Sequence, residues 1–217
     1  MKTRLYTALT LLLLAIGSHA ADVTGEVAAL QHDWAIANYQ LTGDAQDKAF
    51  EDLIARAGAA VDSNPKSADI LIWEGIIKSS YAGIKGGLGA LSLAKQAKKS
   101  LEKAMKLDAQ ALDGSAYTSL GTLYANVPGW PVGFGSDKKA VQFLAKALEI
   151  NPDGIDTNYF YADYLLQKKD FEKAEQYFLK AQRAAPRANR PVADAGRQQQ
   201  IGTGLAQVRS KLNKSGS

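Results

Sequence analysis

The sequence predicts an all-α protein, and three observations support that prediction. The segments between turns are rich in Ala, Leu, Lys, Gln and Glu, which lose little side-chain entropy in a helix. Apolar residues recur at three- and four-residue spacing, as in Ala140, Phe143, Leu144, Ala147 and Leu148, which places them on one stripe of a helix. No segment shows the alternation of polar and apolar residues that is typical of a strand. Clusters of glycine and proline separate the helical segments at 63–66, 83–89, 126–136, 151–154 and 185–191.

Residues 1–20 have the pattern of a secretory signal peptide. Two basic residues lie near its start, an apolar run follows from Ala8 to Ile16, and Ser18-His19-Ala20 provides small residues for a peptidase. The apolar run is shorter than the ~20 residues that span a bilayer, which argues against a membrane anchor. The sequence therefore predicts cleavage after Ala20 and an exported, soluble protein in a bacterial periplasm.

Composition excludes several classes of function. The 217 residues include no cysteine, which excludes disulfides, thiol catalysis, Cys-ligated metal sites and a lipid anchor on cysteine, so the protein is not expected to be a lipoprotein. Of the two histidines, only His32 lies outside the predicted leader, and it has no second catalytic partner beyond the adjacent Asp33. The formal net charge of +4 is too small to steer the protein to nucleic acid. We expect no enzyme, no metal site and no cofactor.

A repeat becomes visible when the ends of the helical segments are aligned. The residues Ala60, Ala104, Ala147 and Ala181 are separated by 44, 43 and 34 residues, and a proline or, once, an alanine follows each of them five residues later. Proline cannot extend the helix that precedes it, so it ends one helical pair and starts the next. The pattern therefore divides residues 24–186 into about four helical hairpins.

The third and fourth hairpins carry the most complete motif. The third contains Leu120-Gly121-Thr122-Leu123-Tyr124, and Trp34 and Trp73 are kept in the first two. The fourth matches at Tyr161, Ala162, Leu165, Phe171, Ala174, Phe178, Ala181 and Pro186. This pattern resembles the tetratricopeptide repeat (TPR), a hairpin of 34 residues. The resemblance implies a right-handed superhelix over residues 21–190, with residues 191–217 forming a C-terminal capping helix and a polar tail.

Two hairpins exceed the repeat length by about ten residues. The surplus segments are 81–90 and 126–135, and both fall between the two helices of a hairpin. Equivalent connections of adjacent repeats lie along one edge, so we expect these two segments to be neighbours. Trp130 and Phe134, which lie among two prolines and three glycines, allow two interpretations. They form an apolar recognition site, or they pack under the neighbouring connection as a small additional core.

The resemblance also implies which residues line the groove. In tetratricopeptide proteins the first helix of each hairpin faces the concave side, which here would be polar to mildly acidic. Asp156 could instead cap a helix, and the arginines at 183, 187, 190 and 197 are expected to form a solvated basic end unless they meet an acidic partner. The candidate binding residues are Trp130, Phe134, Tyr81, Lys85, Tyr124, Thr118, Thr122, Asp156, Tyr159 and Asp163.

The sequence therefore predicts a non-enzymatic module that binds a protein or peptide through the concave groove and the segments 81–90 and 126–135. An alternative is a small-ligand-binding accessory protein of a periplasmic solute transport system. It rests on a more distant resemblance to the T-component proteins of tripartite ATP-independent periplasmic transporters, from which this chain departs because it has no cysteine at the end of the leader. Neither hypothesis involves nucleic acid or insertion into a membrane.

Overall fold

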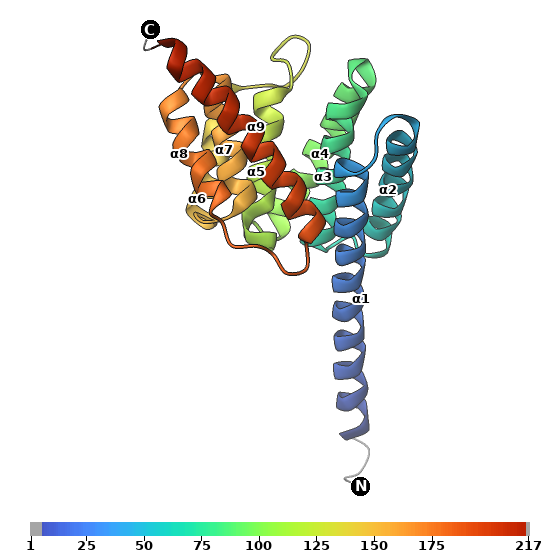
Figure 1. Ribbon diagram of the computed structural model, residues 1–217. Coiled ribbons are helices and arrows are strands. Elements are labelled where there is room, and N and C mark those ends of the chain that lie inside the picture. The colour runs from blue at the N-terminus through green and yellow to red at the C-terminus, as the bar shows by residue number, and fades with distance from the viewer. Residues whose placement is uncertain (1–5, 216–217) are drawn as a thin grey trace.

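The described part of the chain is all-α and forms a TPR-like superhelix of four hairpins followed by a C-terminal helix (Figure 1). This computed structural model describes residues 6–215, with side chains over 23–214. The helices are α1 (Tyr6–Tyr39), α2 (Gly43–Ser63), α3 (Ala68–Lys85), α4 (Gly87–Leu107), α5 (Ala111–Asn126), α6 (Asp137–Ile150), α7 (Ile155–Gln167), α8 (Phe171–Gln182) and α9 (Pro191–Ser215). The first helices of successive hairpins, α1, α3, α5 and α7, contact one another in a row, as the predicted fold requires.

Small residues let the two helices of a hairpin approach closely. A Cβ added at Gly75 in α3 would lie 2.6 Å from Cγ of Leu101 in α4. A Cβ at Gly121 in α5 would lie at the same distance from Cγ of Leu144 in α6. Both leucines are fully buried, so each fills the space that its glycine leaves open. The sequence motif of the repeat therefore has a packing reason in both hairpins.

The core is continuous along the stack. One cluster around Trp34, Phe50 and Trp73 joins α1, α2 and α3, and a second around Leu101 and Leu120 joins α3 to α7. A third cluster joins α7 and α8 to α9. Burial of each large apolar side chain contributes roughly 1.5–3 kcal/mol, so the stack is held mainly by these contacts.

The segment 81–90 is not the loop that its glycines suggest. Helix α3 continues to Lys85, α4 begins at Gly87, and the chain reverses at Gly86, whose φ is 65° and ψ 179°. The segment contains no proline, so both helices extend through it and the surplus residues lengthen the hairpin. The predicted connection at 81–90 is therefore corrected to a turn around a single residue.

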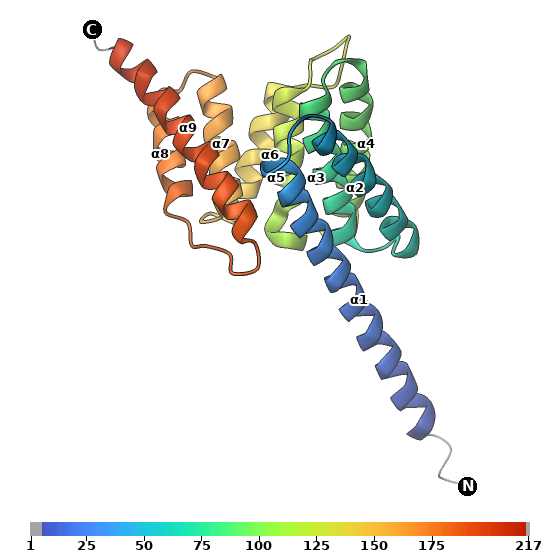
Figure 2. The ribbon, with the colours of Figure 1, turned by 45° about the vertical axis from the view of Figure 1, so that its right-hand side comes forward.

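The segment 126–135 does form a connection, as expected. Helix α5 ends at Asn126, and α6 begins after Ser136, whose hydroxyl accepts a hydrogen bond from the backbone N–H of Lys139. Figures 1 and 2 show this loop at the same end of the stack as the α3–α4 turn. The Lys98 ammonium of α4 lies 5.6 Å from the centroid of the Phe134 ring, so the loop contacts the second helix of the neighbouring hairpin.

Helix α9 covers the last hairpin and also reaches the first. Its residues Ile201 and Val208 are buried against α7 and α8, which is the capping role expected of this segment. Near its N-terminus Gly196 lies directly on the Tyr39 ring of α1, and the Tyr39 hydroxyl donates a hydrogen bond to Oε1 of Gln200 at 3.5 Å. The two ends of the superhelix are therefore joined through α1 and α9 (Figure 1).

The predicted signal peptide coincides with the beginning of the long helix α1, whose N-terminal part projects beyond the packed helices (Figure 1). Residues 1–5 lie outside the described residues, and cleavage after Ala20 stays a prediction. Among the helices that the structure describes, none is long and apolar enough to cross a membrane.

Candidate functional site

Exposed apolar side chains gather at one end of the stack. We call this surface the rim and define it by the α3–α4 turn, 84–88, and the α5–α6 loop, 128–134. Six large hydrophobic side chains are exposed in the described part of the chain, and four of them are rim residues. Trp130 is 90% exposed and Leu88 is 89% exposed. Monomeric proteins rarely leave such residues grouped in contact with water, so the rim is a candidate binding surface.

Backbone hydrogen bonds hold the α5–α6 loop in one conformation. Within it, the N–H of Gly133 donates to the carbonyl of Gly129 at 3.0 Å, and the N–H of Gly135 donates to that of Pro128 at 2.9 Å. A Cβ at Gly135 would overlap the carbonyl oxygen of Val127, so only glycine allows this close approach. These hydrogen bonds and the close approach at Gly135 constrain the backbone of the loop.

The two aromatic residues of the loop have different roles. Phe134 is half-buried and meets the Tyr124 ring edge-on, with ring centroids 5.5 Å apart. Trp130 projects into solvent. The interpretation as an additional core therefore describes Phe134, whereas Trp130 keeps the exposure that a recognition residue needs.

Tyr81 and Tyr124 are core residues. Tyr81 is stacked on the Phe50 ring with centroids 5.4 Å apart, and Tyr124 is stacked on the Phe143 ring at 5.6 Å. Both tyrosines are buried, so they position the rim and do not reach a partner. Lys85 remains accessible, with its ammonium group 3.8 Å from Glu51.

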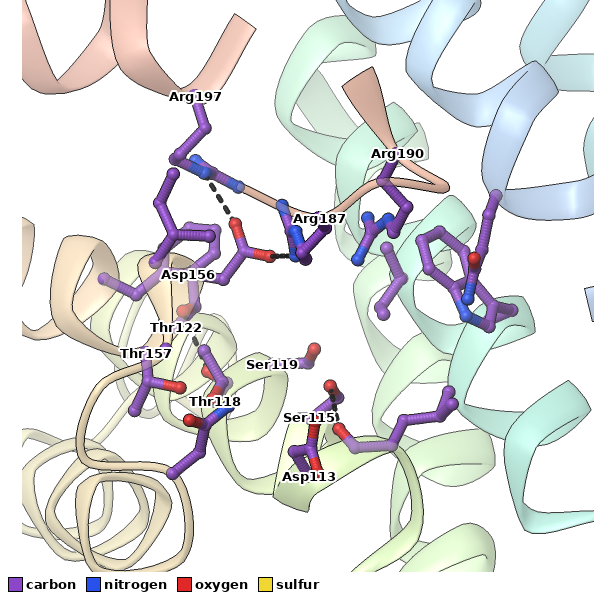
Figure 3. A pocket seen from close by; sticks show the side chains of 18 of the residues that line it. Asp113, Ser115, Thr118, Ser119, Thr122, Asp156, Thr157, Arg187, Arg190 and Arg197 are labelled. Atoms are coloured by element: carbon purple, nitrogen blue, oxygen red, sulfur yellow. Dashed lines mark hydrogen bonds and ion pairs between the residues drawn. The ribbon is translucent and has the colours of Figure 1, made fainter. Parts of the chain in front are cut away.

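The concave side of the superhelix contains a partly open cavity of about 530 Å³. The first helices α1, α3, α5 and α7 form one wall, and the connection between α8 and α9 forms the other, with Arg197 from α9 (Figure 3). Thr118, Thr122 and Asp156 line the cavity, as expected from the alignment. Tyr159 and Asp163 are not among its lining residues.

Three arginines enter this cavity in place of the expected solvated basic end. Asp156 accepts hydrogen bonds from Nη1 of Arg187 and Nε of Arg197, both at 2.7 Å. Arg187 also donates through Nε to Asp194 at 2.7 Å, whereas Arg183 stays exposed. The expectation of a solvated end is therefore wrong for the residues that face the cavity, because α9 folds back and brings them to Asp156 and Asp194.

Asp156 is the centre of this ion-pair network. Burial alone would raise the pKa of its carboxyl group, but Arg197 and Arg187 outweigh that effect and lower the pKa far below its ordinary value. Arg197 is itself buried and lies over the rings of Tyr159 and Phe160, at 4.2 and 4.5 Å from their centroids. The alternative role of Asp156 as a helix cap is wrong, because Gly154 occupies the N-cap of α7.

The chemistry of the cavity is that of a binding site for a polar or anionic group. Opposite the arginines, hydroxyl side chains of α5 face the cavity, and Leu112 and Asp113 beside them have left-handed backbone conformations with φ of 49° and 55°. Among the described residues no three His, Cys, Asp or Glu side chains are placed to share a metal ion. The groove was expected to be mildly acidic, and its α8–α9 side is instead basic.

Comparison with known proteins places the repeat in the C-terminal half of the chain. Residues 138–196 match the family model described as tetratricopeptide repeat. This segment extends from α6 to the start of α9 and includes the hairpin in which the sequence motif is most complete.

Two solved structures, both of the protein MamA, are similar to this chain. The one titled "Crystal structure of MamA" has a TM-score of 0.45 and 18% identity, and covers 81% of this chain and 98% of its own. The one titled "Crystal structure of MamA protein" has a TM-score of 0.44 and 18% identity, and covers 88% of this chain and 95% of its own. No curated protein sequence matches this chain.

Proposed function

We propose that this chain is a non-enzymatic interaction module that binds a segment of a partner protein at the rim. The observation that carries the proposal is the exposure of Trp130 and Leu88 on adjacent hairpins. Burying both side chains would remove on the order of 300 Å² of apolar surface from water, about 7 kcal/mol before the ordering costs of binding. A TPR-like stack, which holds its loops on rigid helices, is suited to this role.

The charge beside the rim selects the kind of partner. Residues 83–101, which form the end of α3 and the first turns of α4, contain four lysines and no aspartate or glutamate, and two of these lysines pair with Glu51 and Glu102 outside this range. Lys138 and Lys139 are exposed at the other side of the loop. The partner segment should therefore combine apolar side chains for Trp130 and Leu88 with acidic residues for the lysines.

Selection from a library of random displayed peptides tests this function. We expect the selected peptides to be acidic and to contain Leu, Phe or Trp. Trp130→Ala should weaken their binding by about 30-fold, the effect of losing a hot-spot residue worth about 2 kcal/mol. Affinity should also fall as salt is raised, because the lysines are exposed.

Leu88→Ala and Leu107→Ala form a matched pair for the same experiment. Both leucines are exposed on α4, Leu88 at the rim and Leu107 at the opposite end of the helix. Leu88→Ala should weaken peptide binding, and Leu107→Ala should leave it unchanged. Equal affinity for all variants, or selected peptides without acidic residues, would contradict the proposal.

The proposed location is the periplasm, and its support is the signal-peptide pattern of residues 1–20. Sequencing the N-terminus of the protein recovered from a periplasmic fraction tests it. We expect the chain to begin at Ala21, so that the packed part of α1, from Val23 onward, is retained. Recovery of an uncleaved chain from the cytoplasm would rule out this location.

A further inference from the structure

We infer that the central cavity is a separate binding site for a small organic molecule with a single carboxylate, and that Arg190 holds that carboxylate. The inference does not depend on the rim, because the cavity lies on the concave side of the stack and shares no lining residue with the rim. It rests on the side chain of Arg190, on the charge balance around it and on the composition of the walls.

Among the described residues, Arg190 is the cavity arginine that forms no ion pair with a carboxylate. Its guanidinium points into the cavity, and its contact in the described part of the chain is with the Trp73 ring, whose centroid lies 5.2 Å from Cζ (Figure 3). The Nε of Arg190 and the Nε1 of Trp73 are both buried without a hydrogen-bond partner. Two adjacent buried donors without an acceptor are costly, and an acceptor in the cavity would remove that cost after a small shift of either side chain.

The charge balance favours a monoanion. The group consists of Arg187 and Arg197, which pair with the carboxylates of Asp156 and Asp194, and of Arg190, which forms no ion pair in the described part of the chain. It therefore retains one positive charge, which one carboxylate would neutralise and a phosphate dianion would exceed. Burial and the nearby Arg187 guanidinium lower the pKa of Arg190, and a bound anion would oppose both effects.

Asp113 and Asp153 also line the cavity but stand outside this network. Figure 3 shows Asp113 on the α5 wall, across the cavity from Arg190. The side chain of Asp153 is 88% exposed and lies 3.3 Å from the ammonium group of Lys180. Neither carboxylate forms an ion pair with Arg190 in the part of the chain that the structure describes.

The other walls describe the rest of the ligand. Ile76, Leu112 and Phe160 give the cavity apolar surface. Of the hydroxyl groups on α5, those of Ser115 and Thr122 donate to backbone carbonyls of their own helix. A volume of about 530 Å³ is within the range of small-molecule sites. The walls therefore suit a molecule with both apolar and polar surface that carries its carboxylate at one end.

The experiment uses fluorescence and thermal unfolding of the full chain. The sequence has three tryptophans, so in a Trp130→Phe background the signal comes from Trp34 and Trp73, which both line the cavity. The probes are acetate, hexanoate and phenylacetate, each beside its neutral amide, and inorganic phosphate. We expect saturable quenching by hexanoate or phenylacetate and no response to the amides. At saturation the melting temperature should rise by about 5 °C.

Arg190→Gln and Arg183→Gln are the matched variants, because both arginines belong to the α8–α9 region and only Arg190 faces the cavity. Arg190→Gln should weaken carboxylate binding by at least about tenfold, and Arg183→Gln should not change it. Arg190→Lys keeps the charge but loses the planar guanidinium, so it should bind the carboxylates with intermediate affinity. If Arg190→Gln does not fold, the affinity of Arg190→Lys tests the role of Arg190. The inference is overturned if no carboxylate binds, if the amides or phosphate bind as tightly, or if the Arg190 variants bind like the parent.

Discussion

Two neighbouring hairpins, α3/α4 and α5/α6, carry surplus segments of nearly equal length that fold in opposite ways. In α3/α4 the surplus residues continue both helices, and the chain reverses at Gly86. In α5/α6 the helices stop at Asn126 and restart at Asp137, and a loop joins them. Pro128 and Pro131 account for the difference, since proline cannot continue a helix and the α3/α4 segment has none. Glycine therefore reverses the chain between α3 and α4 within one residue, whereas the prolines keep a whole loop out of α5 and α6.

The comparison first predicts that substitutions where the paired helices cross destabilise the two hairpins by similar amounts. Gly121→Val should lower the free energy of unfolding by about 3 kcal/mol and Gly75→Val by a similar amount, because each new side chain would overlap a buried leucine of the paired helix. Chemical denaturation followed by circular dichroism measures both. Gly58→Val in α2 is the control, because a Cβ there meets nothing within 4 Å, and its effect should be below about 0.5 kcal/mol. A much smaller loss at either site would show that its hairpin is more loosely packed.

The α7/α8 hairpin has no insertion, and we expect its stability to depend on pH through Asp156. Asp156→Asn should lower the free energy of unfolding by about 2 kcal/mol at neutral pH, because it leaves buried Arg197 without its carboxylate partner. The folded-state pKa of Asp156 lies below its unfolded value of about 3.9. Its contribution is therefore complete above about pH 5 and is lost as the pH falls towards the folded-state pKa.

Thermal unfolding across a pH series measures this effect. The difference between the parent and Asp156→Asn should shrink below about pH 4. Asp153→Asn is the control, since that exposed carboxylate should contribute little at any pH. A difference that does not depend on pH would mean that the network does not set the acid stability.

The smallest expected effect comes from glycine substitutions in the α3–α4 turn and the α5–α6 loop. Gly86→Ala should cost about 1–2 kcal/mol, because a residue with a side chain rarely adopts its backbone angles of 65° and 179°. Gly129→Ala in the α5–α6 loop should be nearly neutral, because its Cβ would meet its nearest neighbour at an ordinary 3.6 Å. Unfolding midpoints of the two variants measure the difference. Equal costs would mean that Gly86 is not the residue that fixes the α3–α4 reversal.

Much of the fold could be predicted because it depends on local patterns. The small residues at helix crossings, the proline at 152 and the apolar stripe of α6 are each visible within one repeat. The location of the two surplus segments on one edge followed from the repeat itself. The continuation of α3 to Lys85 was missed, because four glycines in ten residues outweighed the absence of proline.

The cavity could be predicted only in part. Thr118, Thr122 and Asp156 were found because they lie on the first helices of their hairpins. The arginines were misjudged because Asp156, the partner that Arg187 and Arg197 share, lies 31 and 41 residues from them in sequence and meets them only after α9 folds back. The periodicity of the sequence does not indicate that α9 folds back over the concave side. The burial of Tyr81 and Tyr124 was missed for a related reason, since their stacking partners belong to other helices.

The contact between α9 and α1 has a consequence for how the chain unfolds. In an open array of repeats the terminal units separate first, since each has a neighbour on one side only. Here Gly196 rests on Tyr39, and Ala193 is buried among residues of the first two hairpins, so both termini of the array are secured. Fraying from either end would have to break that closure. The protein should consequently melt in one concerted transition, with no partially unzipped species along the way.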